Sequence, residues 1–132
     1  MEASKIGMVD SRSLTELLGL DEAPVAVAPL ELWPRERRLV AHGQDVHLTG
    51  REFELLRVLL LAAGHVISRA RLHEAVWGEP LPHPRSRSVD VTVRKVRRRL
   101  SEASPGWTYI HTHFGHGYRF EPERSATGRG TQ

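Results

Sequence analysis

The 132-residue sequence contains no cysteine, and this absence excludes several kinds of chemistry at once. Without a thiol the chain can form no disulfide framework, no thiolate zinc site and no cysteine nucleophile. A chain without disulfides is typical of the reducing cytoplasm, where we expect this protein to work. No apolar run approaches the roughly 20 residues that cross a bilayer, and the first residues show no secretory pattern.

Positive charge is concentrated in one short segment of the chain. The net charge is only +3, but residues 85–99 hold seven basic residues and one acidic residue, Asp90. That segment therefore carries +6, which leaves −3 for the rest of the chain. A cationic segment on a slightly acidic body indicates a surface that binds a polyanion. The other interpretation is a solvated helix surface without a partner, because charge runs of this kind are common.

The organisation of the chain predicts one domain between two tails. Residues 1–28 are interpreted as a flexible tail or linker, because APVAVAP at 23–29 resembles an extended, proline-bounded spacer. Residues 29–122 form the predicted domain, and residues 123–132 a second, disordered tail. Residues 30–48 alternate apolar and polar positions and predict three short antiparallel strands. A hairpin turn is expected at 42–45, where glycine supplies any positive φ.

Two helices are predicted by capping signals and apolar spacing. Thr49 and Glu52 have the spacing of a capping box, and an apolar stripe follows them. The stripe and its supporting residues are Phe53, Leu55, Leu56, Val58, Leu59 and Leu60. Gly64 is the expected stop of this helix. Ser68 is expected to cap a second helix that ends near Val76, and its predicted buried residues are Leu72, Ala75 and Val76.

A third helix is predicted from Val89 to about Glu102, with Ser88 as its cap. Its apolar residues at helical spacing form a narrow stripe that faces the core, and they are Val89, Val93, Val96 and Leu100. Residues 107–112 and 118–120 then predict two strands around a loop at 113–117. Three strands, three helices and a terminal hairpin predict an α+β domain.

The face of the third helix opposite the valine stripe has the chemistry that reads duplex DNA. It presents Val91, Thr92, Arg94, Lys95, Arg98 and Arg99. Arginine and lysine can donate to guanine O6 and N7, while Val91 and the Thr92 methyl can contact thymine methyls in the major groove. Arg87 and Ser88 add donors at the helix N-terminus, where phosphate is favoured. The residues therefore predict sequence-specific binding of double-stranded DNA.

Four ordered motifs resemble one family over about residues 30–121. They are LTGREFELLRVLL at 48–60, GHVISRARLHEAVWG at 64–78, RSVDVTVRKVRRRL at 87–100 and GHGYRF at 115–120. The chain resembles the OmpR/PhoB-type winged helix-turn-helix output domains of bacterial two-component response regulators. The resemblance implies a short N-terminal antiparallel sheet, a three-helix bundle with a recognition helix at 88–102, and a C-terminal wing at 109–120 near the minor groove. It also implies a bacterial transcription regulator that associates with the nucleoid when bound.

The resemblance implies roles for individual residues and for partners. Positions that contact DNA in the family correspond here to Arg87, Ser88, Thr92, Arg94, Lys95, Arg97 and Arg98. Positions that touch phosphates correspond to Arg69, Trp77 and Thr112. Family members bind direct-repeat half-sites as head-to-tail pairs, and the loop at 78–86 matches an element that can contact RNA polymerase.

The sequence departs from the family in two places. Phe114 stands where family wings usually carry an arginine, two positions after Thr112. We therefore expect His113, His116 or Phe114 itself to replace the minor-groove contact of that arginine. The 28 or so residues before Leu30 are also too few for the receiver domain that usually precedes such a domain. The chain is therefore either a stand-alone regulator or a piece of a longer protein.

The histidines of the predicted wing raise the alternative of a metal site. Alternate residues of a strand share a face, so His111 and His113 could converge on one ion, with His116 close by. No acid or cysteine nearby completes the site. We expect these histidines to be polar wing residues near phosphates, with no bound metal.

Other functional classes find less support in the residues. No nucleophile elbow, phosphate-cradling glycine loop or metal-ligand helix is present, so we expect no catalytic residues, no cofactor and no enzyme activity. RNA is disfavoured because its deep, narrow major groove excludes a reading helix, and because aromatic residues are only 6% of the chain. The main alternative is a winged helix that serves as a protein-interaction module, for example an RNA polymerase adaptor.

Overall fold

The computed structural model describes residues 23–125, so most of both predicted tails lies outside the described residues. Within 23–125 the chain forms seven strands and three helices, and the predicted α+β class is confirmed. In chain order the elements are β1 (Val25–Val27), β2 (Leu30–Trp33), β3 (Arg38–Ala41), β4 (Gln44–Val46), α3 (Gly50–Leu61), β5 (Val66–Ile67), α4 (Arg69–Trp77), α5 (Ser88–Ala103), β6 (Trp107–His113) and β7 (Gly117–Arg124). No helix of this described part is long and apolar enough to cross a membrane.

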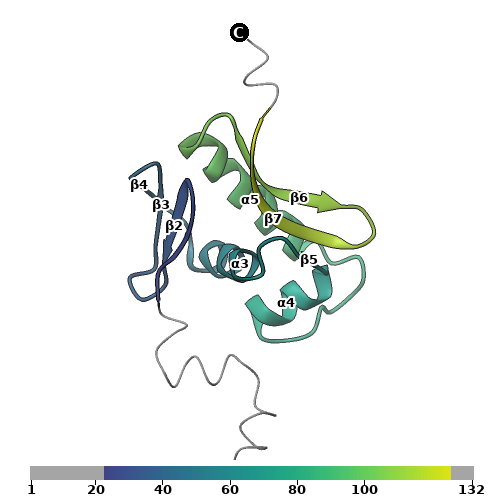
Figure 1. The fold of residues 1–132 in the computed structure, drawn as a ribbon. Coiled ribbons are helices and arrows are strands. Elements are labelled where there is room, and N and C mark those ends of the chain that lie inside the picture. Colours follow the sequence, from purple (N-terminus) through teal and green to yellow (C-terminus); the bar gives the residue numbers. More distant parts are fainter. Residues whose placement is uncertain (1–22, 126–132) are drawn as a thin grey trace, which may run out of the picture.

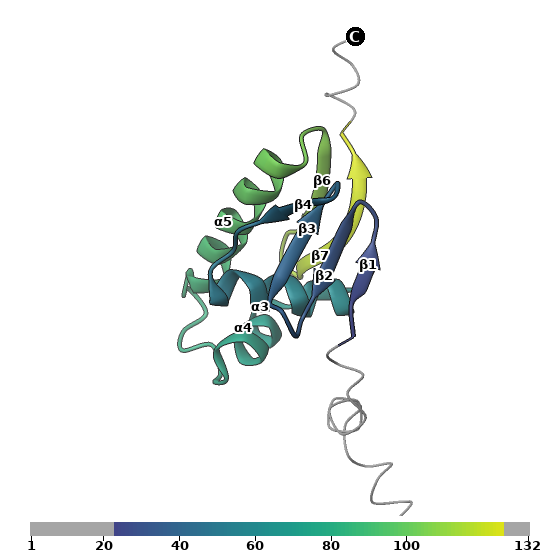
Figure 2. The ribbon, with the colours of Figure 1, turned by 90° about the vertical axis from the view of Figure 1, so that its left-hand side faces the viewer.

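The N-terminal sheet has four antiparallel strands in the order β1-β2-β3-β4, one more than predicted. The additional strand is β1, in which Val25 pairs with Leu32 and Val27 with Leu30. The interpretation of 23–29 as a spacer outside the domain was therefore wrong for β1, because its two valines pack against the core. Figure 2 looks onto this sheet and shows α5 running alongside β4.

The turn between β3 and β4 lies at His42 and Gly43, inside the predicted range. Both residues adopt positive φ, 51° and 81° respectively. Positive φ at both central positions is characteristic of the type I′ hairpin turn, whose twist matches that of its strands. The glycine was expected to supply this conformation, and the structure adds His42.

Helix α3 lies between the N-terminal sheet and the C-terminal hairpin, at the centre of the core (Figure 1). The predicted capping box is confirmed, because Thr49 Oγ1 accepts from the Glu52 amide at 3.2 Å and Glu52 Oε1 accepts from the Thr49 amide at 3.0 Å. The buried apolar residues of α3 are Phe53, Leu55, Leu56, Leu59 and Leu60. Burying one such side chain contributes about 1.5–3 kcal/mol, so this helix organises the domain.

Helix α4 begins as predicted, with Ser68 Oγ accepting from the Arg71 amide at 3.1 Å. Its buried face differs from the prediction. Leu72 is buried and Val76 half-buried, but Ala75 is exposed and His73 takes an inner position with 3% exposure. The inner face of this short helix runs through 72, 73, 76 and 77, which leaves Ala75 on the outer side. The His73 ring Nδ1 lies 2.8 Å from the Glu79 carbonyl oxygen, which satisfies the buried imidazole.

Helix α5 buries the predicted stripe, since Val89, Val93, Val96 and Leu100 are at most 2% exposed. The predicted cap was wrong. Ser88 is the first helical residue, and the capping position is Arg87, whose side chain makes no capping hydrogen bond. The Ser88 hydroxyl instead lies 3.2 Å from the Ser86 hydroxyl.

The C-terminal sheet has the strand order β5-β7-β6, and its β6–β7 hairpin is the predicted wing. Strand β5 was not predicted; it pairs with β7 through Val66 opposite Arg119 and Ile67 opposite Tyr118. Strand β7 runs to Arg124, so the predicted domain end at residue 122 was two residues short. Gly117 is required where β5 meets β7, because a Cβ at this position would lie 2.0 Å from the Ile67 carbonyl oxygen.

Candidate nucleic-acid interface

An exposed stripe runs along α5 on the side away from the core. It consists of four residues at helical spacing, Val91, Arg94, Lys95 and Arg98. Val91 is 39% exposed, an unusual state for a valine beside three cations. Within residues 23–125 the side chains of Arg94, Lys95 and Arg98 make no hydrogen bond or ion pair. Three unneutralised cations around an apolar patch are therefore free to meet an external polyanion.

Two further residues of the predicted DNA-facing set are held inside the domain instead. Thr92 is only 8% exposed, and its hydroxyl donates to the Ser88 carbonyl oxygen at 2.9 Å. Arg99 turns toward α3, where its Nε donates to Glu52 Oε1 at 3.1 Å. Glu52 is nearly fully buried and also closes the capping box of α3, so the pair joins α5 to the start of α3.

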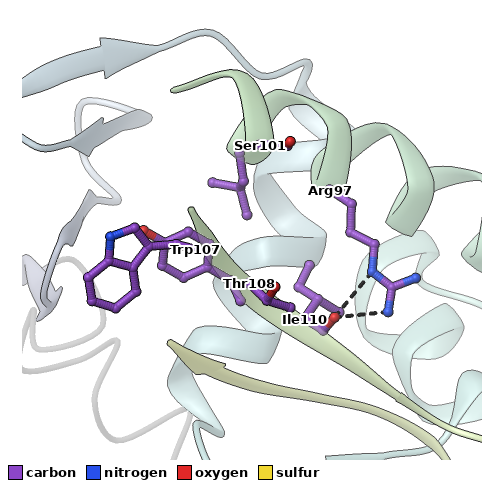
Figure 3. A pocket seen from close by; sticks show the side chains of 7 residues that line it. Arg97, Ser101, Trp107, Thr108 and Ile110 are labelled. Atoms are coloured by element: carbon purple, nitrogen blue, oxygen red, sulfur yellow. Dashed lines mark hydrogen bonds between the residues drawn. The ribbon is translucent and has the colours of Figure 1, made fainter. Parts of the chain in front are cut away.

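Arg97 lies on the wing side of α5 and fastens the helix to β6. Its guanidinium donates twice to the Ile110 carbonyl oxygen, at 2.9 and 3.2 Å, and once to Thr112 Oγ1 at 2.6 Å. Figure 3 shows this guanidinium reaching Ile110 at one end of a hollow of about 200 Å³ between α5 and β6. The hollow is lined by Arg97, Leu100, Ser101, Trp107, Thr108, Tyr109 and Ile110. Arg97 thus fixes the distance between the helix and the wing.

The carboxylate of Asp90 connects the first turn of α5 to the wing and to α4. It accepts from the Tyr118 hydroxyl at 2.5 Å, and its oxygens lie 3.1 Å from Arg69 Nη2 and 3.5 Å from Arg87 Nε. Burial alone would raise the pKa of Asp90, but the hydrogen bonds from Tyr118 and Arg69 and the charges of Arg69 and Arg87 outweigh it. They hold the pKa of Asp90 below its usual value of 3.8.

Burial and the neighbouring Asp90 carboxylate together raise the pKa of Tyr118 to about 12. This connection was not predicted, because Asp90 was considered only as the one acidic residue of the cationic segment. The signal was the tyrosine of the GHGYRF motif, 28 residues further along the chain.

Arg69, a predicted phosphate contact, is occupied within the domain. Besides Asp90 it donates to the carbonyl oxygens of Pro84, at 3.1 Å, and Ser86. Its side chain therefore holds the loop between α4 and α5 against the start of α5. The indole of Trp77, another predicted phosphate contact, is half-buried between the His73 ring, at 4.7 Å between centroids, and the Arg51 guanidinium at 4.8 Å.

The wing displays one large apolar side chain at its tip. Phe114 is 89% exposed, and His116 beside it is exposed as well. His113 Nε2 accepts from Arg119 Nε at 3.0 Å, and His111 Nε2 lies 2.9 Å from the Glu121 carbonyl oxygen. Burial lowers the pKa of His111, although Glu123 opposes that shift. Among residues 23–125 no group of three histidines and acids is arranged to hold a metal ion.

Comparison with known proteins places this geometry in a family. The protein-family model described as "Transcriptional regulatory protein, C terminal" matches residues 43–120, which is more than half of the chain. The chain belongs to this family. The match confirms the OmpR/PhoB-type resemblance that the four sequence motifs predicted.

Relatives of this transcriptional regulatory domain include both sequences and solved structures. The transcriptional regulatory protein PrrA of Mycobacterium leprae is 44% identical over 94 residues, which cover 71% of this chain and 40% of PrrA. The DNA-binding domain of CpxR from E. coli is 33% identical, with a TM-score of 0.67, over 74% of this chain and 95% of that one. The Klebsiella pneumoniae RstA DNA-binding domain, solved in complex with the RstA box, is 27% identical, with a TM-score of 0.67 and the same two coverages. The chain thus spans about 40% of the length of PrrA but nearly all of two isolated DNA-binding domains.

Proposed function

We propose that this domain binds double-stranded DNA in a sequence-specific manner, as the DNA-reading part of a bacterial transcription regulator. The observation that carries the proposal is the exposed stripe of α5, where three cations without an internal partner follow the exposed Val91 along the same face of the helix. A helix fits the major groove by width, and this mixture of donors and a methyl-bearing side chain suits base edges there. The structural similarity to the CpxR and RstA DNA-binding domains supports the same role.

The predicted DNA-binding residues then fall into four groups. Val91, Arg94, Lys95 and Arg98 face the bases, while Arg87 and Ser88, at the start of α5, contact phosphate together with Trp77 and Thr112. Four further residues with partners inside the domain set the position of α5 and the wing, and they are Arg69, Thr92, Arg97 and Arg99. The wing residues His113, Phe114 and His116 lie beside the neighbouring minor groove.

Further parts of the proposal rest on the family alone. Two copies would bind direct-repeat half-sites head to tail, and the loop at 78–86 would be available to RNA polymerase. Binding of this kind involves no catalysis, and we place it in the cytoplasm, where chromosomal DNA lies. Cations alone would also suit an acidic protein surface, as in a polymerase adaptor, but cations together with the exposed Val91 on one helix face suit base edges, so DNA binding is the better account of that stripe.

Selection from a random duplex library tests the proposal. We expect the full 132-residue chain to enrich one short sequence, repeated in tandem if two copies bind. Binding of the enriched duplex should weaken steeply with salt, because each neutralised phosphate contributes about −0.9 to the slope of log K against log[salt]. Arg38→Ala is a matched control, because it removes one cation from the N-terminal sheet, where Arg38 pairs with Asp45. No enrichment, with weak binding to every duplex, would leave only a basic surface and would favour the adaptor role.

A further inference from the structure

The tip of the wing combines an exposed aromatic ring with a rigid support. Phe114 occupies the turn of the β6–β7 hairpin and is 89% exposed, the most exposed of the large apolar side chains within residues 23–125. A single exposed apolar side chain is common on protein surfaces, so the case for a partner rests on where Phe114 is placed and how it is supported.

The support of the tip is built from contacts on three sides. The His116 amide donates to the His113 carbonyl oxygen at 2.8 Å and closes the turn. Below the turn, the Thr112 hydroxyl accepts a hydrogen bond from Arg97 of α5, and the Tyr118 hydroxyl donates a hydrogen bond to Asp90 of α5. Gly117 packs directly on the backbone of β5, where no side chain would fit. The phenylalanine is therefore presented in a fixed position relative to the exposed stripe of α5.

The wing lies beside α5, on the side where Arg97 joins the two. Thr112 is hydrogen-bonded to α5 through Arg97, and Phe114 lies two residues further, in the turn that follows β6. In B-DNA the minor groove lies next to the major groove, across one phosphate backbone. With α5 in the major groove, the tip of the wing is therefore directed toward the adjacent minor groove.

The charge of the wing fits DNA better than a protein partner. Residues 108–120 contain no acidic residue, and they carry one arginine and three histidines. Arg119 is paired with Glu121 at the far end of this range, so the tip itself carries no acidic side chain that would repel phosphate. A surface of this sign favours the minor groove over the apolar pocket of an unrelated protein.

We propose that Phe114 is an apolar wedge that enters the minor groove and partly unstacks one base step, so that the domain reads DNA deformability as well as base edges. Apolar side chains that wedge between base steps kink the duplex, and flexible pyrimidine–purine steps resist this least. This inference rests on the proposed DNA binding and adds a second source of specificity, located at a step that α5 does not touch.

The test uses the full chain and the duplex that the wild type enriches, with 2-aminopurine placed at successive positions beside the α5 site. Wild type should raise 2-aminopurine fluorescence at one step and bend the duplex in an end-to-end energy-transfer measurement. Phe114→Ser should lose both signals and bind on the order of 10-fold more weakly, since stacking of one base on an aromatic ring is worth that much or more. Phe114→Leu, which keeps an apolar wedge, should retain most of both. Because the Phe114 side chain is exposed, both substitutions should leave the fold intact, and circular dichroism checks this.

Separate outcomes distinguish the wedge from DNA binding itself. Lys95→Ala at saturating concentration should keep the unstacking signal while it weakens binding. Phe114→Ser that binds, bends and unstacks like the wild type would overturn the wedge and leave the proposed function intact. Loss of self-association in that variant, with unchanged unstacking, would instead identify the tip as a contact between copies and would also overturn the wedge. A wild type that binds no duplex would refute the wedge together with the proposed function.

Discussion

Replacement of Asp90 by alanine tests how the reading helix is held against the wing. The change removes the acceptor of the Tyr118 hydroxyl and one anchor of Arg69. An unpaired buried hydroxyl costs about 1–3 kcal/mol, and the hydroxyl of Tyr118 belongs to a residue that is 7% exposed. The side chain of Arg69 is 30% exposed and keeps two carbonyl partners, so the loss of its ion pair with Asp90 destabilises the domain less than the unpaired Tyr118 hydroxyl does. The free energy of unfolding should therefore fall by about 2–4 kcal/mol.

Urea unfolding followed by tryptophan fluorescence measures this change, and variants that keep part of the contact sharpen it. Asp90→Asn retains an acceptor for Tyr118 and should lose only about half as much. Tyr118→Phe should cost about 1–2 kcal/mol in the wild type and much less when Asp90 is already alanine, because the two residues share one hydrogen bond. Strictly additive losses, or an Asp90→Ala variant within about 0.5 kcal/mol of wild type, would refute the view that this contact holds the wing to α5.

Three further predictions concern other supports of the interface. Gly117→Ala should lower the free energy of unfolding by about 3 kcal/mol or more, because the added Cβ would meet the Ile67 carbonyl oxygen at 2.0 Å. Thermal unfolding measures this loss, and an unchanged melting temperature would contradict the close packing of β5 on β7. The raised pKa of Tyr118, about 12, means that its stabilising contribution is fully present below the unfolded pKa of about 10 and is lost as pH rises toward 12. Tyr118→Phe should flatten that alkaline decline, and equal slopes in the two proteins would contradict the assignment. Glu52→Ala should lower the free energy of unfolding by about 2 kcal/mol, because it removes the α3 capping box and the partner of Arg99. Glu52→Gln should lower it less, because the amide oxygen can still accept the capping hydrogen bond. Equal losses for the two variants in chemical unfolding would argue against the cap.

The parts of the fold that sequence predicted correctly are those determined by neighbouring residues. The Thr49 capping box closes over three positions, and the valine stripe of α5 repeats within one helix. Strand β5 has two residues and exists only because β7 pairs with it some 50 residues later, so no local pattern marks it. Strand β1 was misread for a related reason, because a short VAV segment beside prolines becomes a strand only when β2 lies next to it.

The candidate interface was predicted in kind but not in detail. The apolar spacing and the local charge of the sequence identified α5 as the cationic helix, and the three exposed cations of its stripe were all among the predicted residues. Sequence could not separate the cations that face outward from those with partners, because each partner comes from a distant element. Arg99 meets Glu52 of α3, and Arg97 meets Ile110 of β6. Only the folded structure separates the basic residues of this segment into those that face outward and those that have partners inside the domain.

The most direct test of the central claim is base-pair-resolved affinity for the wild type, Lys95→Ala and Arg98→Ala on every single substitution of the enriched duplex. If α5 reads base edges, each variant should lose discrimination at one defined position, by about 1–3 kcal/mol, while the other positions keep their ranking. Arg38→Ala should leave the whole profile unchanged. A uniform loss across all duplexes would contradict the claim, because it would reduce the stripe to a phosphate-binding surface that carries no sequence information.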